Sequence, residues 1–348
     1  MSTPNLSSKD HQFDNWDAAQ EFYLENGLTD GLPIVPPTNE KVQAMLDYCN
    51  LSPDTIIGQE PVRQKEFTAE KIAINAVMAG CKPEYFPVVL ASVEAALQDE
   101  FCMHGLLCTT YFSSPVMIVN GPITKEIGMN SGINALGQGN RASATIGRAL
   151  QLLIRNVGGG IPGGIDRATM GNPGKYTFCF AEDESDDGWA TLAQDRGFTR
   201  LDSIISLFPG EGLQPIVDQK SRTAASLAKS IAKSLQTVVN AKLYGAADAI
   251  LVVSVEHRRV IRDSGWTKEN FREALSENLT MPASDLIIGA QGISEGMPEA
   301  FKDQVVNKFR DDGLHIASTG AKAGMFSAII SGWVARGEKG GQLVSQKI

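Results

Sequence analysis

Three loops in the second half of the sequence each follow an apolar run and hold residues suited to catalysis. AILVVSV leads into Glu256 and His257, DLIIGA leads into Gly292, and LHIAST leads into Lys322 and Gly324. The carboxyl ends of parallel strands meet at one edge of a sheet, where ligands of such folds bind. A histidine beside a carboxylate suits general acid or base chemistry, and glycine amides at a helix start favour an anion. We therefore expect catalysis by the first pair and substrate binding by the other three residues.

Each of these loops also has a purely structural interpretation. The glycines could serve only to turn the chain tightly from strand to helix, and His257 could be a strand-end histidine bonded to backbone. GAKAGMFS lacks the GxxxxGK[ST] spacing of a phosphate-binding loop, so the sequence gives ATP hydrolysis little support.

A second candidate is the acidic segment that ends KYTFCFAEDESDDGW. Side chains alternate along a strand, so Glu182 and Glu184 should share one side while Asp183 faces the other. Paired carboxylates bind Mg²⁺ or Ca²⁺, or divide into an acid and a base. We therefore expect Glu182 and Glu184 to be catalytic residues or ligands of a divalent metal. The alternative is a solvated acidic turn.

A third candidate is FCMHGLLC, which holds Cys102, His104 and Cys108. Thiolate and imidazole bind zinc, but this spacing is not a usual zinc pattern and no fourth ligand lies nearby in the sequence. Either cysteine could instead be a catalytic thiol, which would need His104 as its base. The structural alternative is a buried, unreactive cysteine.

The stretch GNRASATIGRALQLLIRNVGGGIPGG, residues 139–164, predicts one helix between two glycine-rich loops. Arg141, Arg148 and Arg155 recur every seven residues and lie opposite the apolar face of that helix. The apolar face consists of Ile146, Leu150, Leu153 and Val157. The arginine stripe should therefore face solvent, a second domain, a symmetry mate or an anionic ligand.

The loop before this helix contains Asn130, Asn134 and Asn140 among its glycines. Asn and Gly tolerate left-handed backbone and offer amide donors, so we expect these three residues and Arg141 to bind the substrate. GQGNRA formally matches a dinucleotide fingerprint, but it does not directly follow a strand and no second strand comes after the helix. NAD and FAD are therefore not expected as cofactors.

Composition and charge exclude several classes of protein. The chain of 348 residues is 43% apolar and 20% charged, as in a soluble globular protein. A net charge of −9 argues against nucleic acid or an anionic membrane as partner. No apolar run reaches the ~20 residues of a membrane span, and five cysteines without a CxxC pair indicate reduced thiols. We expect a cytoplasmic protein that forms a homo-oligomer.

The order of the expected elements predicts an α/β fold with two domains. Residues 1–12 form a polar, mobile tail, and residues 13–210 form a helix-rich domain with a smaller sheet and the Gly/Asn-rich loops. A turn-rich stretch at 209–220 marks the boundary; a long surface loop within one domain is the alternative. Residues 211–348 alternate strands with helices, among them a helix near 298–310 and an apolar helix that follows LHIAST and runs to Trp333. This alternation predicts a mostly parallel sheet covered on both faces.

Three segments resemble a largely uncharacterised bacterial family. They are NGLTDGLPIVPPTNEKV, the central run from VNGPI through GNRASATIGRA to RNVGG, and PGKYTFCFAEDE with DRGF. That family occurs beside or fused to UGSC-type (seleno)proteins, which resemble component B of the glycine and betaine reductases. The resemblance spans most of the chain and implies a metabolic enzyme, but it supplies no catalytic residues. This sequence lacks a Cys-Gly-Ser-Cys segment, which argues against a direct thiol redox role.

Together these features predict an enzyme that acts on a small anionic organic substrate in a cleft between the domains. The expected chemistry is general acid/base catalysis of the lyase or hydrolase type, with His257 or Glu182 moving the proton. One alternative is a thiol or redox enzyme, or a component of a reductase system, that uses Cys102 or Cys108. A further alternative is a non-catalytic ligand-binding or partner subunit.

Overall fold

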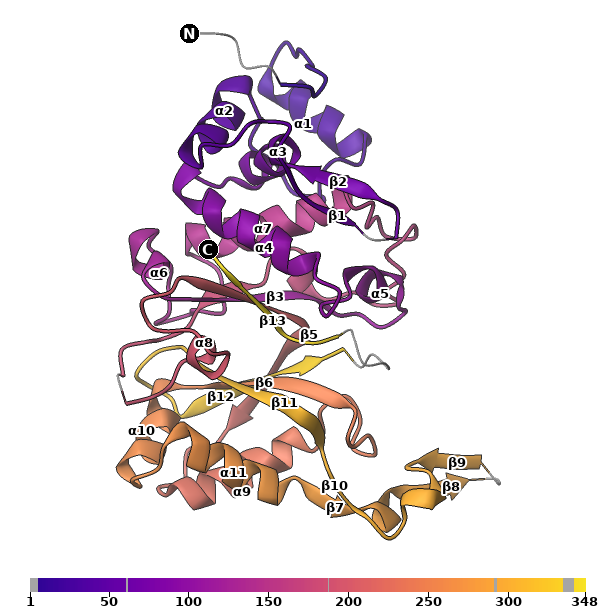
Figure 1. Ribbon diagram of the computed structural model, residues 1–348, viewed down its shortest axis with the longest axis vertical. Coiled ribbons are helices and arrows are strands. Elements are labelled where there is room, and N and C mark those ends of the chain that lie inside the picture. The colour runs from indigo at the N-terminus through magenta and orange to yellow at the C-terminus, as the bar shows by residue number, and fades with distance from the viewer. Residues whose placement is uncertain (1–5, 61, 187, 291–292, 334–340) are drawn as a thin grey trace.

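The computed structural model describes residues 6–60, 62–186, 188–290, 293–333 and 341–348. Its fold is α/β: a curled sheet crosses the middle of the molecule, with one group of helices above it and another below (Figure 1). The upper group comes from the first half of the chain and the lower group from the second half (Figure 1).

The first hundred residues are mainly helical, and local capping residues fix where several of these helices begin and end. The N-cap side chains of Asn15 and Thr68 accept backbone hydrogen bonds, and Gly80 ends its helix in left-handed backbone with φ 96°. A hairpin of β1 (Ile56–Glu60) and β2 (Lys65–Thr68) interrupts the helices. The helices of this half are α1 (Trp16–Glu25), α2 (Asn39–Tyr48), α3 (Ala69–Ala79), α4 (Phe86–Ala96), α5 (Met103–Cys108), α6 (Ile123–Glu126), α7 (Arg141–Asn156) and α8 (Leu192–Asp195), with 3-10 turns η1 (Pro83–Tyr85) and η2 (Pro173–Lys175).

The second half supplies the lower helices and an arm that extends from the body (Figure 1). Its helices are α9 (Ala224–Leu235), α10 (Val255–Asp263) and α11 (Lys268–Asn278), with 3-10 turns η3 (Ala283–Leu286) and η4 (Glu299–Phe301). The strands of the whole chain are β1 (Ile56–Glu60), β2 (Lys65–Thr68), β3 (Ser114–Asn120), β4 (Cys179–Ala181), β5 (Ile204–Val217), β6 (Ala247–Val253), β7 (Thr280–Pro282), β8 (Ile287–Ala290), β9 (Ile293–Gly296), β10 (Val305–Asn307), β11 (Phe309–Ser318), β12 (Phe326–Gly332) and β13 (Val344–Lys347).

The central sheet has the order β11-β6-β12-β5-β3-β4, and β13 also pairs with β5. The prediction of a mostly parallel sheet was wrong, because only β11–β6 and β3–β4 are parallel pairs. The predicted strand DLIIGA is also absent from this sheet, since β8 forms a hairpin with β9 in the arm.

Two predicted helices are strands in the structure. The apolar segment expected to be helical up to Trp333 is β12, which runs antiparallel between β5 and β6. Ala328 and Ile330 pack on one face of the sheet, and Ile329 belongs to the core on the other face. The helix expected near 298–310 contains the short turn η4 and strand β10 instead. Short apolar runs do not distinguish strand from helix by their spacing alone.

The stretch at 209–220, predicted to be a turn-rich boundary, lies largely within β5. The first half of this strand pairs with β3 and β13, and its second half pairs with β12. Both halves of the chain therefore contribute to one continuous sheet, and the predicted boundary at 210 falls inside a strand. The division into two domains stays a prediction.

Candidate functional site

The arginines of α7 contact the segment around residues 27–33 and the end of α3. Arg148 binds both carboxylate oxygens of Asp30 at 2.8 and 2.7 Å. Arg141 donates to the carbonyl of Gly80, and Arg155 donates through Nε to the carbonyl of Gly27 at 3.0 Å. The stripe thus faces other parts of its own chain, and α7 holds the N-terminal connection in place.

Glu182 and Glu184, which follow the end of β4, converge on one partner. Asn120 donates through Nδ2 to both carboxylates, at 2.8 Å in each case. Glu182 also accepts from the amides of Leu192 and Ser318 and is fully buried. Burial raises the pKa of this carboxyl against the opposing charge of Lys268. These contacts tie β3, α8 and β11 together, which gives Glu182 a structural task; its catalytic role stays a prediction.

Two other carboxylates of this region form ion pairs with basic side chains of the same chain. Asp183 binds Arg258 at 2.9 Å, and both side chains are largely buried. Lys268 binds Asp195 at 2.7 Å. Among the residues that the structure describes, no group of three or more His, Cys, Asp or Glu side chains could hold a metal ion. The predicted metal site at Glu182 and Glu184 therefore gains no further ligand from the described residues.

His257 is completely buried beneath the predicted rim. Its Nε2 is 2.9 Å from the carbonyl oxygen of Asp218, which can only accept, so Nε2 carries the proton. Nδ1 then accepts from the hydroxyl of Ser327 at 2.7 Å. Glu256 does not orient this ring, because its carboxylate accepts the amide of Met325. Both ring nitrogens are thus used by the fold, and the assignment of catalysis to His257 stays a prediction.

The loops expected to bind substrate do approach each other. Asn134 and Gly137 from one loop, with Gly320 and Phe326 from the other, line an open groove of about 420 Å³. Lys322 lies at the surface. Gly324 has a φ of 110°, a backbone conformation that residues other than glycine rarely adopt. Gly292 lies outside the described residues.

The asparagine side chains of this region bind local backbone. Asn130 donates to the carbonyl of Ile133, and Asn134 donates to that of Gln138. Asn140 accepts the amide of Ser143 as the N-cap of α7. Their amides shape the loop before α7, and binding of substrate by them stays a prediction.

A thiol, an imidazole and a carboxylate lie close together at α5, in the segment FCMHGLLC. His104 and Cys108 are four residues apart on this helix, so their side chains lie on one face. Cys108 Sγ is 3.3 Å from His104 Nε2, and His104 Nδ1 is 3.3 Å from Glu60 Oε1. An exposed thiol, an imidazole and a nearly buried carboxylate thus stand in series.

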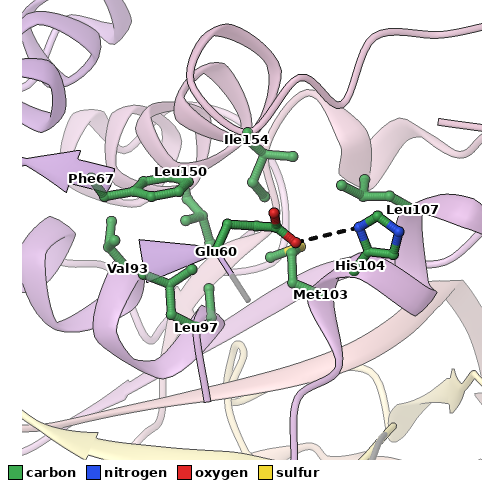
Figure 2. A pocket seen from close by; sticks show the side chains of 11 residues that line it. Glu60, Phe67, Val93, Leu97, Met103, His104, Leu107, Leu150 and Ile154 are labelled. Atoms are coloured by element: carbon green, nitrogen blue, oxygen red, sulfur yellow. Dashed lines mark ion pairs between the residues drawn. The ribbon is translucent and has the colours of Figure 1, made fainter. Parts of the chain in front are cut away.

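Glu60 is held rigidly at the end of β1. Its carboxylate accepts the amides of Val62 and Arg63 in the turn that follows, and its side chain is only 7% exposed. Figure 2 shows the Glu60–His104 pair beside a narrow apolar cavity of about 20 Å³. Phe67, Leu97, Met103, Leu107, Leu150 and Ile154 are among the residues that line it. These walls keep water away from the Glu60 carboxylate, which strengthens its contact with His104.

Cys108 opens onto a wide pocket of about 720 Å³, which we call the thiol pocket. Arg63 and Arg167 line it, together with Gly159, Ile161 and Gly164 of the glycine-rich loop after α7. Arg63 donates to the carbonyl of Gly158 at 2.9 Å. Arg167 is exposed, and no described residue pairs with its guanidinium.

The remaining cysteines lie in different environments. Burial raises the pKa of the Cys81 thiol to about 12 and also raises that of Cys179. Cys102 precedes α5 in left-handed backbone with φ 55° and lines none of the pockets described here. Of the two thiols predicted as candidates, Cys108 alone is placed against an imidazole in the described residues.

No pattern in the sequence indicated Glu60, Arg63 or Arg167 as parts of this site. Glu60 precedes His104 by more than forty residues, and the β1–β2 hairpin brings it to α5.

No protein-family model, curated protein or solved structure matches the chain. None of the described helices is long and apolar enough to cross a membrane.

Proposed function

We propose that this protein is a hydrolase in which Cys108 is the nucleophile, His104 the general base and Glu60 the group that orients the imidazole. The observation that carries the proposal is the series Cys108 Sγ, His104 and Glu60, with 3.3 Å at each contact. A nucleophile, a base and an orienting carboxylate in series is the arrangement that activates a thiol. We keep the small anionic substrate that the sequence predicts, but we assign catalysis to residues at α5 in place of His257 and Glu182.

The reaction begins when Cys108 gives its proton to His104 Nε2 and the thiolate attacks the carbonyl carbon of the substrate. The bond to the leaving group breaks as that group takes the proton from His104, which leaves a thioester on Cys108. Water then gives a proton to His104 and attacks the thioester carbon. The bond between that carbon and sulfur breaks, Cys108 takes the proton back from His104, and the free acid leaves, so no oxidant or reductant is consumed.

The position of Cys108 makes its partners essential. It is the last residue of α5, where the partial negative charge of a helix end disfavours a thiolate. Stabilisation must therefore come from protonated His104 and from the two arginines of the thiol pocket. Glu60 favours the imidazolium that forms, because its carboxylate lies against Nδ1.

Arg63 and Arg167 point to an acyl substrate that carries a negative charge. A guanidinium binds carboxylate through two parallel hydrogen bonds, and Arg167 is free of other pairs among the described residues. The substrate class that fits is an ester or thioester with a carboxylate a few bonds from the reacting carbonyl.

The proposal is tested with two aryl esters, p-nitrophenyl hydrogen succinate and the uncharged p-nitrophenyl acetate. We expect the native protein to prefer the succinate ester. Cys108→Ala and His104→Gln should each lower kcat by about a hundredfold or more. Arg167→Met should raise KM for the succinate ester only. Cys49→Ala is the matched control, since it removes a free thiol that does not line this pocket.

Two outcomes would overturn the proposal. If Cys108→Ala keeps its activity while His104→Gln loses it, His104 acts as a general base without a thiol nucleophile. If the native protein hydrolyses neither ester faster than the Cys108→Ala variant does, the thiol is not catalytic and the ligand-binding alternative gains ground.

A further inference from the structure

A second cavity, of about 470 Å³, lies against the same glycine-rich loop, and we call it the Arg155 pocket. Gly160, Pro162 and Asp166 line this cavity, whereas Gly159, Ile161 and Gly164 line the thiol pocket. The two cavities share no lining residue, so a molecule in one leaves the walls of the other intact. A volume of several hundred Å³ is typical of small-molecule sites.

The charges around the Arg155 pocket do not cancel. Lys175 binds Asp166 at 2.6 Å, and Arg148 binds Asp30 at 2.7 Å, so these four groups neutralise one another. Arg155 uses Nε for the carbonyl of Gly27, and no described carboxylate pairs with it. One half-buried guanidinium is therefore left without a counterion in a concave cavity.

The geometry also leaves donors available. The terminal nitrogens of Arg155 have no hydrogen-bond partner among the described residues, and the ammonium of Lys175 has two further N–H groups beside the one that binds Asp166. A half-buried cation without a counterion is costly, and a bound anion would remove that cost. The walls also include Tyr176 and Ser114, whose hydroxyls suit a polar ligand.

We propose that the Arg155 pocket binds a small organic anion, a carboxylate or a phosphate, through Arg155 and Lys175. This site is separate from the thiol pocket and does not depend on Cys108 chemistry. Its ligand is a second molecule that occupies the protein together with the acyl substrate.

The test is isothermal titration calorimetry with succinate and with inorganic phosphate. We expect the native protein to bind at least one of them at two sites, the thiol pocket and the Arg155 pocket. Arg155→Met should remove one site or weaken it about tenfold or more, because a charge-assisted hydrogen bond is lost. Arg167→Met should remove the other site only. Arg222→Met is the matched control, since this exposed arginine also donates to backbone carbonyls but lines neither pocket.

A second variant guards against a folding defect in Arg155→Met. The double variant Lys175→Met with Asp166→Asn removes the ion pair without leaving a buried charge, and we expect it to weaken the same site. The proposal is overturned if neither probe binds native protein, or if both variants keep native affinity within twofold. Loss of the Arg167 site alone bears on the hydrolase proposal and leaves this one intact.

Discussion

His104 and Cys108 are four residues apart, so their pairing could be proposed from the sequence, whereas their partner Glu60 could not. Local spacing fixes which side chains share a helix face, but the carboxylate comes from a distant hairpin. The opposite holds for His257 and Glu182, whose residue types suit catalysis. Burial and complete hydrogen bonding give both a structural explanation that the sequence does not contain.

At the residue scale, Glu211 should make stability depend on pH. Burial raises the pKa of this carboxyl to about 7, beside the hydroxyl of Tyr111. Its ordinary value is near 4.3, so the unfolded chain releases this proton first as the pH rises. The contribution to the free energy of unfolding is full below about pH 4 and is lost as the pH rises through 7. Urea unfolding at pH 4.5 and 7.5 should show a smaller loss in Glu211→Gln than in the native protein, and equal losses would contradict this account.

At the scale of elements, the capped helices were predicted well and several strands were not. Helix α7 forms between the two glycine-rich loops as predicted, and Asn140 caps it, because N-cap interactions act within a few residues. The segments that became β5 and β12 contain proline, glycine or short apolar runs, and their strand conformation comes from partners far along the chain. Tertiary pairing thus overrode the local pattern.

Replacing Arg148 should weaken the contact between α7 and the segment around Asp30. Arg148→Met leaves Asp30 without its partner in a site where both side chains are nearly buried. Against the effect of burial, Arg148 holds the pKa of Asp30 below its ordinary value. We expect the free energy of unfolding to fall by about 3 kcal/mol and expect Asp30→Asn to restore part of it. Urea denaturation measures both, and a change under about 0.5 kcal/mol for the single variant would refute the assignment.

At the scale of the whole molecule, one sheet contains strands from both parts of the chain, 13–210 and 211–348, that the sequence predicts as separate domains. Strand β5 pairs with strands from both halves, and Glu182 connects β3 to α8 and β11. The α/β class follows from the alternation of strands and helices, but strand order and direction depend on long-range pairing. The composition of PGEGLQPIVDQK therefore indicates a boundary where the fold has a continuous strand.

Unfolding should reflect that continuity. Because β5 crosses residue 210 without a break, we expect residues 13–210 and 211–348 to lose structure together. Tryptophan fluorescence and far-UV circular dichroism should then give coincident urea transitions. Two separated transitions, one for each half, would support independent domains instead.

The most direct test of the central claim is the rate at which iodoacetamide alkylates Cys108 near neutral pH, read by peptide mass mapping. Only the thiolate reacts, so a thiol that can pass its proton to a neighbouring imidazole is alkylated faster than one that cannot. We predict that His104→Gln lowers the rate at Cys108 by about tenfold or more and that Glu60→Gln lowers it in part. A rate at Cys108 that His104→Gln leaves unchanged would contradict the account.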